Sequence, residues 1–306
     1  MLIAAMASFF ELDPIFQLYL NAYCAIALTC AITGILGTFI VGNRLAFFSD
    51  ALAHCAFTGI ALGLLLALLQ QGLSEQAIDD RFVPIVMMIA GVCFAVGIVY
   101  VREQTALPSD TIIAVFFAGA IGFGVMLLAG LRRFTSIDPD QYLFGNPLFV
   151  NSVDLIALGC LICILLVGLR WFNPFLLSSF STSLARSRQI NTHLLQYLFV
   201  ILIALAVNIS IRAVGVLLIN AMLLVPAATA ANLARNIRQF FWLTLGISLT
   251  TGLLGLWLSD HLAIPVANSR QPLQFGPSGL IVVFSVILFF LSTIYRQIMR
   301  QAYRTD

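Results

Sequence analysis

Long apolar runs separated by short polar stretches make up most of this chain. The runs last about 18 to 25 residues, which is the length that a helix needs to cross a hydrocarbon core about 30 Å thick. A transmembrane β-barrel would instead show short strands of alternating polarity. The pattern therefore predicts helical spans at about 16–41, 44–69, 82–101, 111–131, 155–169, 194–211, 213–231, 241–258 and 280–295.

The region 194–231 decides the number of spans. Arg212 separates two apolar runs there, and the second run carries Asn220, Pro226 and Thr229. A proline inside a helix removes a backbone donor, so this run is expected to be bent or broken, as helices that line transport pathways often are. We expect an all-α, polytopic membrane protein with about nine transmembrane helices if this region spans twice, or about eight if part of it is re-entrant.

Composition supports this class and excludes others. Of the 306 residues, 61% are hydrophobic and 9% are charged, which is too apolar for a soluble domain. All fifteen basic residues are arginine, so the chain lacks the lysine of a P-loop and is not itself a P-loop ATPase. The net charge of +2 is too small to indicate a nucleic-acid partner. No second domain is evident, so we expect a single transmembrane domain over 1–306.

The arginines predict the orientation in the membrane. If the arginine-rich C-terminal tail is cytoplasmic and the chain crosses nine times, most arginines lie inside and most acidic residues lie outside. The polar segment 173–192 then faces the cytoplasm. Its pattern predicts a short amphipathic helix outside the membrane, where a soluble partner could bind.

The second apolar run carries an ionisable pair. Asp50 and His54 are four residues apart, so they lie on one helical face together with Thr58 and Ala61. Counted from Arg44, Asp50 lies roughly 9 Å and His54 roughly 15 Å along the helix axis, inside the hydrocarbon core. An ionisable pair at that depth is costly, which makes it a candidate functional site.

Two interpretations of this pair compete. The carboxylate and imidazole could bind each other as polar packing between helices. They could instead offer oxygen and nitrogen ligands to a divalent transition metal. The absence of a Lys or a further Arg beside them favours the metal. Thr58, Asn220 and Thr229 are weaker candidates for a pathway lining, and interhelical hydrogen bonding is the alternative for Asn220.

Three motifs resemble the permease subunits of zinc/manganese-type ABC importers. They are SDALAH at 49–54, LFG at 143–145 and AVGVLLINAMLLVPAATAANLAR at 213–235, within which Pro226-Ala-Ala-Thr229-Ala is the most specific. The similarity covers nearly the whole chain in order and in span spacing. The resemblance implies a homodimeric channel in the bacterial plasma membrane, served outside by a metal-binding solute-binding protein and inside by an ABC ATPase.

The resemblance also implies roles for particular residues. Asp50 and His54 correspond to the family's candidate metal-coordinating residues. The segment that couples to the ATPase corresponds to 181–190, with the candidate contact residues Ser181, Leu184, Ala185, Arg186, Arg188 and Ile190. Zinc is the expected cargo, with manganese or iron as alternatives. The metal is transported rather than kept as a cofactor.

Two other functional classes remain open at the level of sequence. A proton-coupled secondary metal transporter could use Asp50 and His54 as a proton relay. An intramembrane hydrolase is poorly supported, because the chain has no H-E-x-x-H motif and no second carboxylate paired with a membrane histidine. We therefore expect a transporter permease and not an enzyme, with ATP hydrolysed by a partner subunit.

Overall fold

The computed structural model of the chain describes residues 14–43, 45–71, 82–131, 150–168, 191–264, 273–274 and 276–302. In this part of the chain there are nine α-helices and one antiparallel pair of two-residue strands. The elements are α2 (Pro14–Gly42), α3 (Ala46–Gln71), α4 (Phe82–Gln104), α5 (Ser109–Leu131), α7 (Ser152–Gly168), α10 (Thr192–Val214), α11 (Val216–Leu233), α12 (Ile237–His261), β1 (Ala263–Ile264), β2 (Leu273–Gln274) and α13 (Pro277–Ala302).

The nine helices coincide with the nine predicted runs, in the same order. Eight of them are long and apolar enough to cross a membrane. The ninth, α7, has 17 residues, which is the lower end of the length that a spanning helix needs. The prediction of an all-α, multi-pass membrane protein is confirmed.

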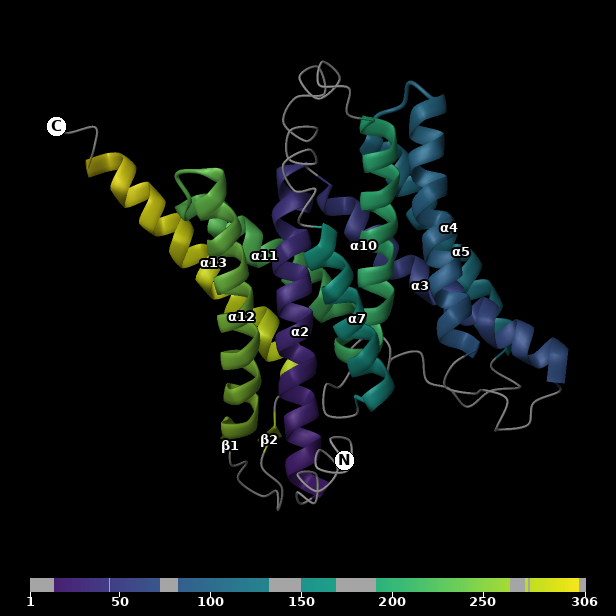
Figure 1. The fold of residues 1–306 in the computed structure, drawn as a ribbon, viewed down its shortest axis with the longest axis horizontal. Helices are drawn as coiled ribbons and strands as arrows, with labels where there is room; N and C mark the ends of the chain where they lie inside the picture. Colours follow the sequence, from purple (N-terminus) through teal and green to yellow (C-terminus); the bar gives the residue numbers. More distant parts are fainter. Residues whose placement is uncertain are drawn as a thin grey trace.

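The helices form a bundle that alternates in direction. Figure 1 shows α2 near the middle, with α12 and α13 on one side and α3, α4 and α5 on the other. In this view α2, α4 and α13 run towards one end of the molecule, whereas α5, α10 and α12 run towards the other. These directions are those that nine successive crossings require.

The region 194–231 was expected to hold two runs separated at Arg212, with the second run bent or broken. α11 continues through Pro226 as one helix, so a break in the second run is wrong. The two helices α10 and α11 are separated at Gly215, three residues after Arg212, where φ is 83°. Glycine adopts this backbone conformation without steric cost. Pro226 removes one hydrogen bond within α11, and a membrane helix tolerates this loss when neighbouring helices stabilise it.

The buried core extends through the helix contacts of the bundle, and part of it lies where α2 packs against α11 and α12. Ile26, Ile32 and Ile40 of α2 are fully buried. Polar contacts join the same helices, since Ser248 Oγ donates to the main-chain oxygen of Cys30 at 2.8 Å and lies 3.2 Å from Thr33 Oγ1. Small residues and buried hydroxyls are the usual means by which helices associate in a membrane.

The position of α3 is fixed by α4 and α5, its main neighbours. A Cβ atom at Gly59 would lie 2.7 Å from the Cα of Met87, so only glycine permits the backbones of α3 and α4 to approach this closely. Since α3 carries Asp50 and His54, this contact places the candidate site.

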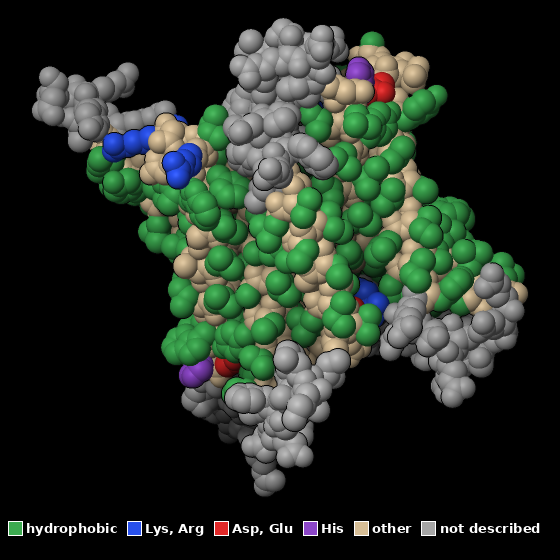
Figure 2. All heavy atoms as spheres, viewed as in Figure 1, with side chains coloured by type: hydrophobic (Ala, Val, Ile, Leu, Met, Phe, Trp, Pro, Cys, Tyr) green, Lys and Arg blue, Asp and Glu red, His purple; other side chains and the backbone are tan. Residues whose placement is uncertain are grey.

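The visible surface is apolar over most of its area. Figure 2 shows hydrophobic side chains across the middle of the molecule, with most charged side chains near its two ends. Large apolar side chains on α5 and α13, such as Val115, Met126, Val283 and Ile287, are more than half or half exposed. Such a surface suits contact with lipid chains.

Candidate functional site

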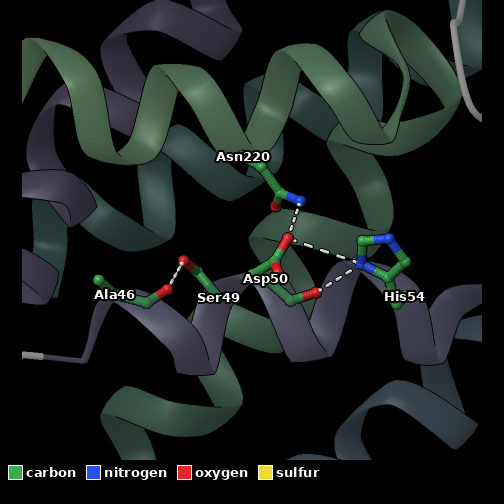
Figure 3. A network of polar contacts seen from close by, with 5 residues as sticks. All are labelled: Ala46, Ser49, Asp50, His54 and Asn220. Atoms are coloured by element: carbon green, nitrogen blue, oxygen red, sulfur yellow. Dashed lines mark hydrogen bonds and ion pairs between the residues drawn. The ribbon is translucent and has the colours of Figure 1, made fainter. Parts of the chain in front are cut away.

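Asp50 lies near the start of α3 and is bound by a side chain from a different helix. The amide of Asn220 in α11 donates from Nδ2 to Asp50 Oδ1 at 2.7 Å. Figure 3 shows the Asn220 side chain pointing from α11 onto the carboxylate. The sequence predicted that Asn220 either lines the pathway or forms a hydrogen bond between helices. It forms such a hydrogen bond, and its partner is Asp50, the predicted metal ligand.

His54 follows Asp50 by one turn of α3, and its ring orientation is defined. His54 Nδ1 lies 3.0 Å from the main-chain oxygen of Asp50 and 3.6 Å from Asp50 Oδ1. Both oxygens are acceptors, so Nδ1 is the donor in this contact. Figure 3 shows the other ring nitrogen, Nε2, on the side of the ring that faces away from Asp50. A histidine ligates a metal through this nitrogen when the ring is neutral and Nδ1 is bonded to an acceptor.

The pair is partly open on the surface of a single chain. Side-chain exposure is 42% for Asp50 and 28% for His54. The ring of Phe117 in α5 meets the imidazole edge-on, with 5.0 Å between centroids, and Phe57 lies at 6.3 Å. Apolar rings therefore cover part of His54, and the rest of the side chain is exposed.

Asp50 and His54 provide too few ligands for a closed metal site. In the described part of the chain, no group of three or more His, Cys, Asp or Glu side chains is placed to hold a metal ion. One carboxylate and one imidazole can bind a divalent metal only if water or another molecule completes the coordination. The arrangement suits a site that binds metal transiently.

Thr58 does not join this pair. Its side chain is fully buried, and Oγ1 donates to the main-chain oxygen of Ala120 in α5. Ala61 is also fully buried. Two steps of four residues advance about 80° beyond full turns, so Thr58 is turned from the open face at Asp50 towards α5.

Thr229 also lies apart from the pair. It sits in α11, more than two turns beyond Asn220, and is 3% exposed. Its Oγ1 donates within the helix to the main-chain oxygen of Val225 at 2.8 Å. The structure therefore brings Asn220 to Asp50 and His54, but neither Thr58 nor Thr229.

Two parts of the predicted machinery lie outside the described residues. These are Arg44 and the candidate coupling segment with Ser181, Leu184, Ala185, Arg186, Arg188 and Ile190. Residues 143–145, which carry one of the three motifs, are also outside.

Sequence reasoning missed two polar contacts between helices. Arg212 Nε lies 3.4 Å from Asp154 Oδ1, which joins α10 to α7. Glu103 at the end of α4 lies 2.9 Å from His193 Nδ1 and accepts from Tyr197 Oη at 2.9 Å, which joins α4 to α10. Buried charges need partners, so Asp154 and Arg212 at the ends of two apolar runs were a signal for the first of these.

Comparison with known proteins agrees with the fold and with the motifs. The chain matches the ABC 3 transport family over residues 15–296. It is 32% identical over 267 residues to the high-affinity zinc uptake system membrane protein ZnuB of Haemophilus influenzae, a match that covers 87% of this chain and 93% of that protein.

Two further comparisons extend the similarity. Over 249 residues the chain is 29% identical to the manganese transport system membrane protein MntC of Halalkalibacterium halodurans, covering 79% of this chain and 80% of that one. The solved structure of PsaBC from Streptococcus pneumoniae in complex with Fab aligns with a TM-score of 0.71 at 25% identity and covers 95% of both chains.

Proposed function

Because this chain belongs to the ABC 3 transport family, we propose that it forms the membrane pathway of an ATP-driven importer of divalent transition-metal ions. The chain is a multi-pass transporter permease of the bacterial inner membrane. Zinc is the cargo that we favour, and manganese or iron are the alternatives. Relatives named for zinc and for manganese uptake support this class of substrate. The proton-coupled secondary transporter is not favoured, since the matched family consists of ABC permeases.

One observation carries the assignment of the site. Asp50 and His54 lie side by side on α3, with 3.6 Å between His54 Nδ1 and Asp50 Oδ1, and both side chains are partly exposed. A carboxylate oxygen and an imidazole nitrogen are suitable ligands for zinc. We propose that metal on its way through the permease binds these two side chains.

A second copy of the chain would complete the coordination. Two copies that face each other across a twofold axis would supply two carboxylates and two imidazoles, which suits tetrahedral zinc. The partial exposure of Asp50 and His54 in a single chain supports this arrangement, because it leaves the pair accessible to a second copy. An incomplete site in each copy also lets the metal leave again.

Two other partners follow from the division of labour in an ABC importer. An ABC ATPase would bind the segment 173–192 on the cytoplasmic side and supply the energy for alternating access. A metal-binding solute-binding protein would deliver the ion on the opposite side. The absence of lysine, and hence of a P-loop lysine, supports an ATPase on a separate subunit.

The proposed function is tested by metal uptake. Cells that produce the chain with the ATPase and binding protein encoded beside it are given labelled zinc or manganese, and wild type is compared with Asp50→Ala and His54→Ala at equal membrane abundance. Both variants are expected to lose uptake of the cargo metal. Asp110→Ala, which alters an exposed acidic residue in the first turn of α5, is the matched control and should transport normally.

Two results would contradict the proposal. Normal uptake by Asp50→Ala and His54→Ala would return the pair to a packing role. Uptake that follows the proton gradient and persists without ATP would favour the secondary transporter. Cysteines placed at 50 in two copies should also form a cross-link if the two α3 helices face each other, and failure to cross-link would contradict the shared site.

A further inference from the structure

The side-chain amide of Asn220 has a hydrogen-bond partner for its nitrogen but none for its oxygen among the described residues. Nδ2 donates to Asp50 Oδ1 at 2.7 Å, whereas Oδ1 of Asn220 is buried and has no hydrogen-bond partner among the described residues. A buried amide oxygen without a partner carries a desolvation cost that an apolar side chain of similar shape would avoid. The hydrogen bond to Asp50 is therefore what an amide, rather than a leucine, contributes at this position.

This hydrogen bond makes the two oxygens of Asp50 unequal. Oδ1 accepts the Asn220 amide and lies 3.6 Å from His54 Nδ1. In the described part of the chain, no hydrogen bond reaches Oδ2. A metal that approaches this carboxylate therefore meets one engaged oxygen and one free oxygen. Such a hydrogen bond to a ligating carboxylate fixes its orientation towards the metal.

α11, which carries Asn220, is packed against two further helices. Met222 lies two residues after Asn220 in α11, is 1% exposed, and has its sulfur 4.0 Å from Thr251 Oγ1 of α12 and 3.9 Å from Ser285 Oγ of α13. The Asn220 amide is therefore presented to Asp50 by a packed helix and not by a loop.

We propose that Asn220 is a specificity-determining residue that restricts Asp50 to one metal-binding oxygen and thereby favours zinc over manganese. This inference rests on the proposed function and on the site shared by two copies. With one oxygen and one nitrogen from each copy the metal has four ligands, which is the coordination number that zinc prefers. With both carboxylate oxygens from each copy it would have six, which suits the octahedral geometry of manganese.

The test separates the effect of the Asn220 hydrogen bond from the effect of the side-chain volume. Asn220→Leu keeps a similar volume and removes the donor, so Oδ1 of Asp50 becomes free to bind metal. Asn232→Leu is the matched control, because Asn232 is also an amide of α11, bonded to Ser292 Oγ and Thr293 Oγ1 of α13 at 3.1 Å each and remote from Asp50. Asn220→Ala serves as a second variant if the leucine disturbs the packing.

Two measurements are made on the full chain assembled with its ATPase. Equilibrium titration of the purified complex with zinc gives the zinc affinity. A second titration with manganese, in which electron paramagnetic resonance detects the free metal, gives the manganese affinity. Uptake in cells gives the ratio of zinc to manganese transported at matched abundance. Asn220→Leu is expected to lower zinc affinity about tenfold and to hold or raise manganese affinity. Asn232→Leu should leave the ratio unchanged.

Each alternative result has a defined meaning. An unchanged ratio, or an equal loss of both metals, in folded Asn220→Leu and Asn220→Ala would overturn the role in specificity. A wild-type complex that binds neither metal, or Asp50→Ala with unchanged binding, would instead overturn the proposed function and this inference with it. A structural role alone would lower thermal stability without moving the ratio of the two metals.

Discussion

Arg212 in the last turn of α10 reaches Asp154 in the first turn of α7, with 3.4 Å between Nε and Oδ1. The two side chains are mostly buried, with 21% and 10% of their surface exposed. Asp154 also accepts from the main-chain N–H of Asn151 at 3.4 Å, which helps to cap the start of α7. The ion pair thus ties α7 to a helix whose end leads directly into α11.

Removal of one partner of this pair should destabilise the bundle. Arg212→Met leaves the buried carboxylate of Asp154 without its cation, which we expect to cost about 3 kcal/mol. The double variant Arg212→Met with Asp154→Leu removes both charges and should recover most of the loss. Thermal unfolding in detergent measures both, with Arg238→Met at an exposed position as control. A double variant as unstable as the single one would contradict an ion-pair effect.

The joint between α10 and α11 should depend on glycine. Gly215→Ala places a Cβ on a residue with φ of 83° and ψ of 162°, a conformation that is essentially confined to glycine, and we expect a loss of about 2 kcal/mol in the free energy of unfolding. Gly122→Ala is the control, because it lies within α5 and a Cβ there meets no other atom within 4 Å. The melting temperatures of the two variants should move apart, and equal melting temperatures would show that the positive φ is unimportant.

Close contact between α3 and α4 should matter for transport as well as stability. Gly59→Val forces the Cβ against Met87, so α3 must move away from α4, and we expect a cost of about 2 kcal/mol. Because α3 carries the ligands, uptake per folded molecule should fall too. Gly119→Val on the open side of α5 provides the comparison. Full uptake by folded Gly59→Val would mean that the site tolerates a shift of α3.

Thr58 should behave as a packing residue. Thr58→Val keeps the shape of the side chain and removes the donor to the main-chain oxygen of Ala120, which we expect to cost about 1 kcal/mol. Zinc and manganese uptake per folded molecule should stay at the wild-type level. A changed ratio of the two metals would instead assign Thr58 to the pathway.

The sequence predicted the helices well and the site only in part. Length and polarity determine which segments can cross a bilayer, so the ends of the nine helices were predicted within four residues, except that α13 continues seven residues beyond its predicted end. The i, i+4 spacing placed Asp50 and His54 on one face of α3. It could not reveal the contact with Asn220, which is 170 residues away in sequence and depends on how α11 packs against α3.

The continuity of α11 at Pro226 has a physical explanation. Proline weakens an isolated helix, but in a membrane protein the neighbouring helices can stabilise a helix that has lost one backbone hydrogen bond. The boundary between the two runs was predicted at Arg212 because the arginine interrupts the apolar pattern, and the structure places it three residues later, at Gly215. The positive φ that interrupts the chain there is visible only in the fold.

The exposure of Asp50 and His54 on α3 has a consequence for how much of this subunit accumulates in the membrane. In a lone copy, ionisable side chains open to hydrocarbon raise its free energy in the bilayer, and a protein neighbour that covers them lowers it. By mass action, a copy made in excess of its neighbours stays in the less stable form. Because proteases in the cell degrade the less stable form of a protein more readily, the amount of subunit would follow the supply of its neighbours rather than its own rate of synthesis.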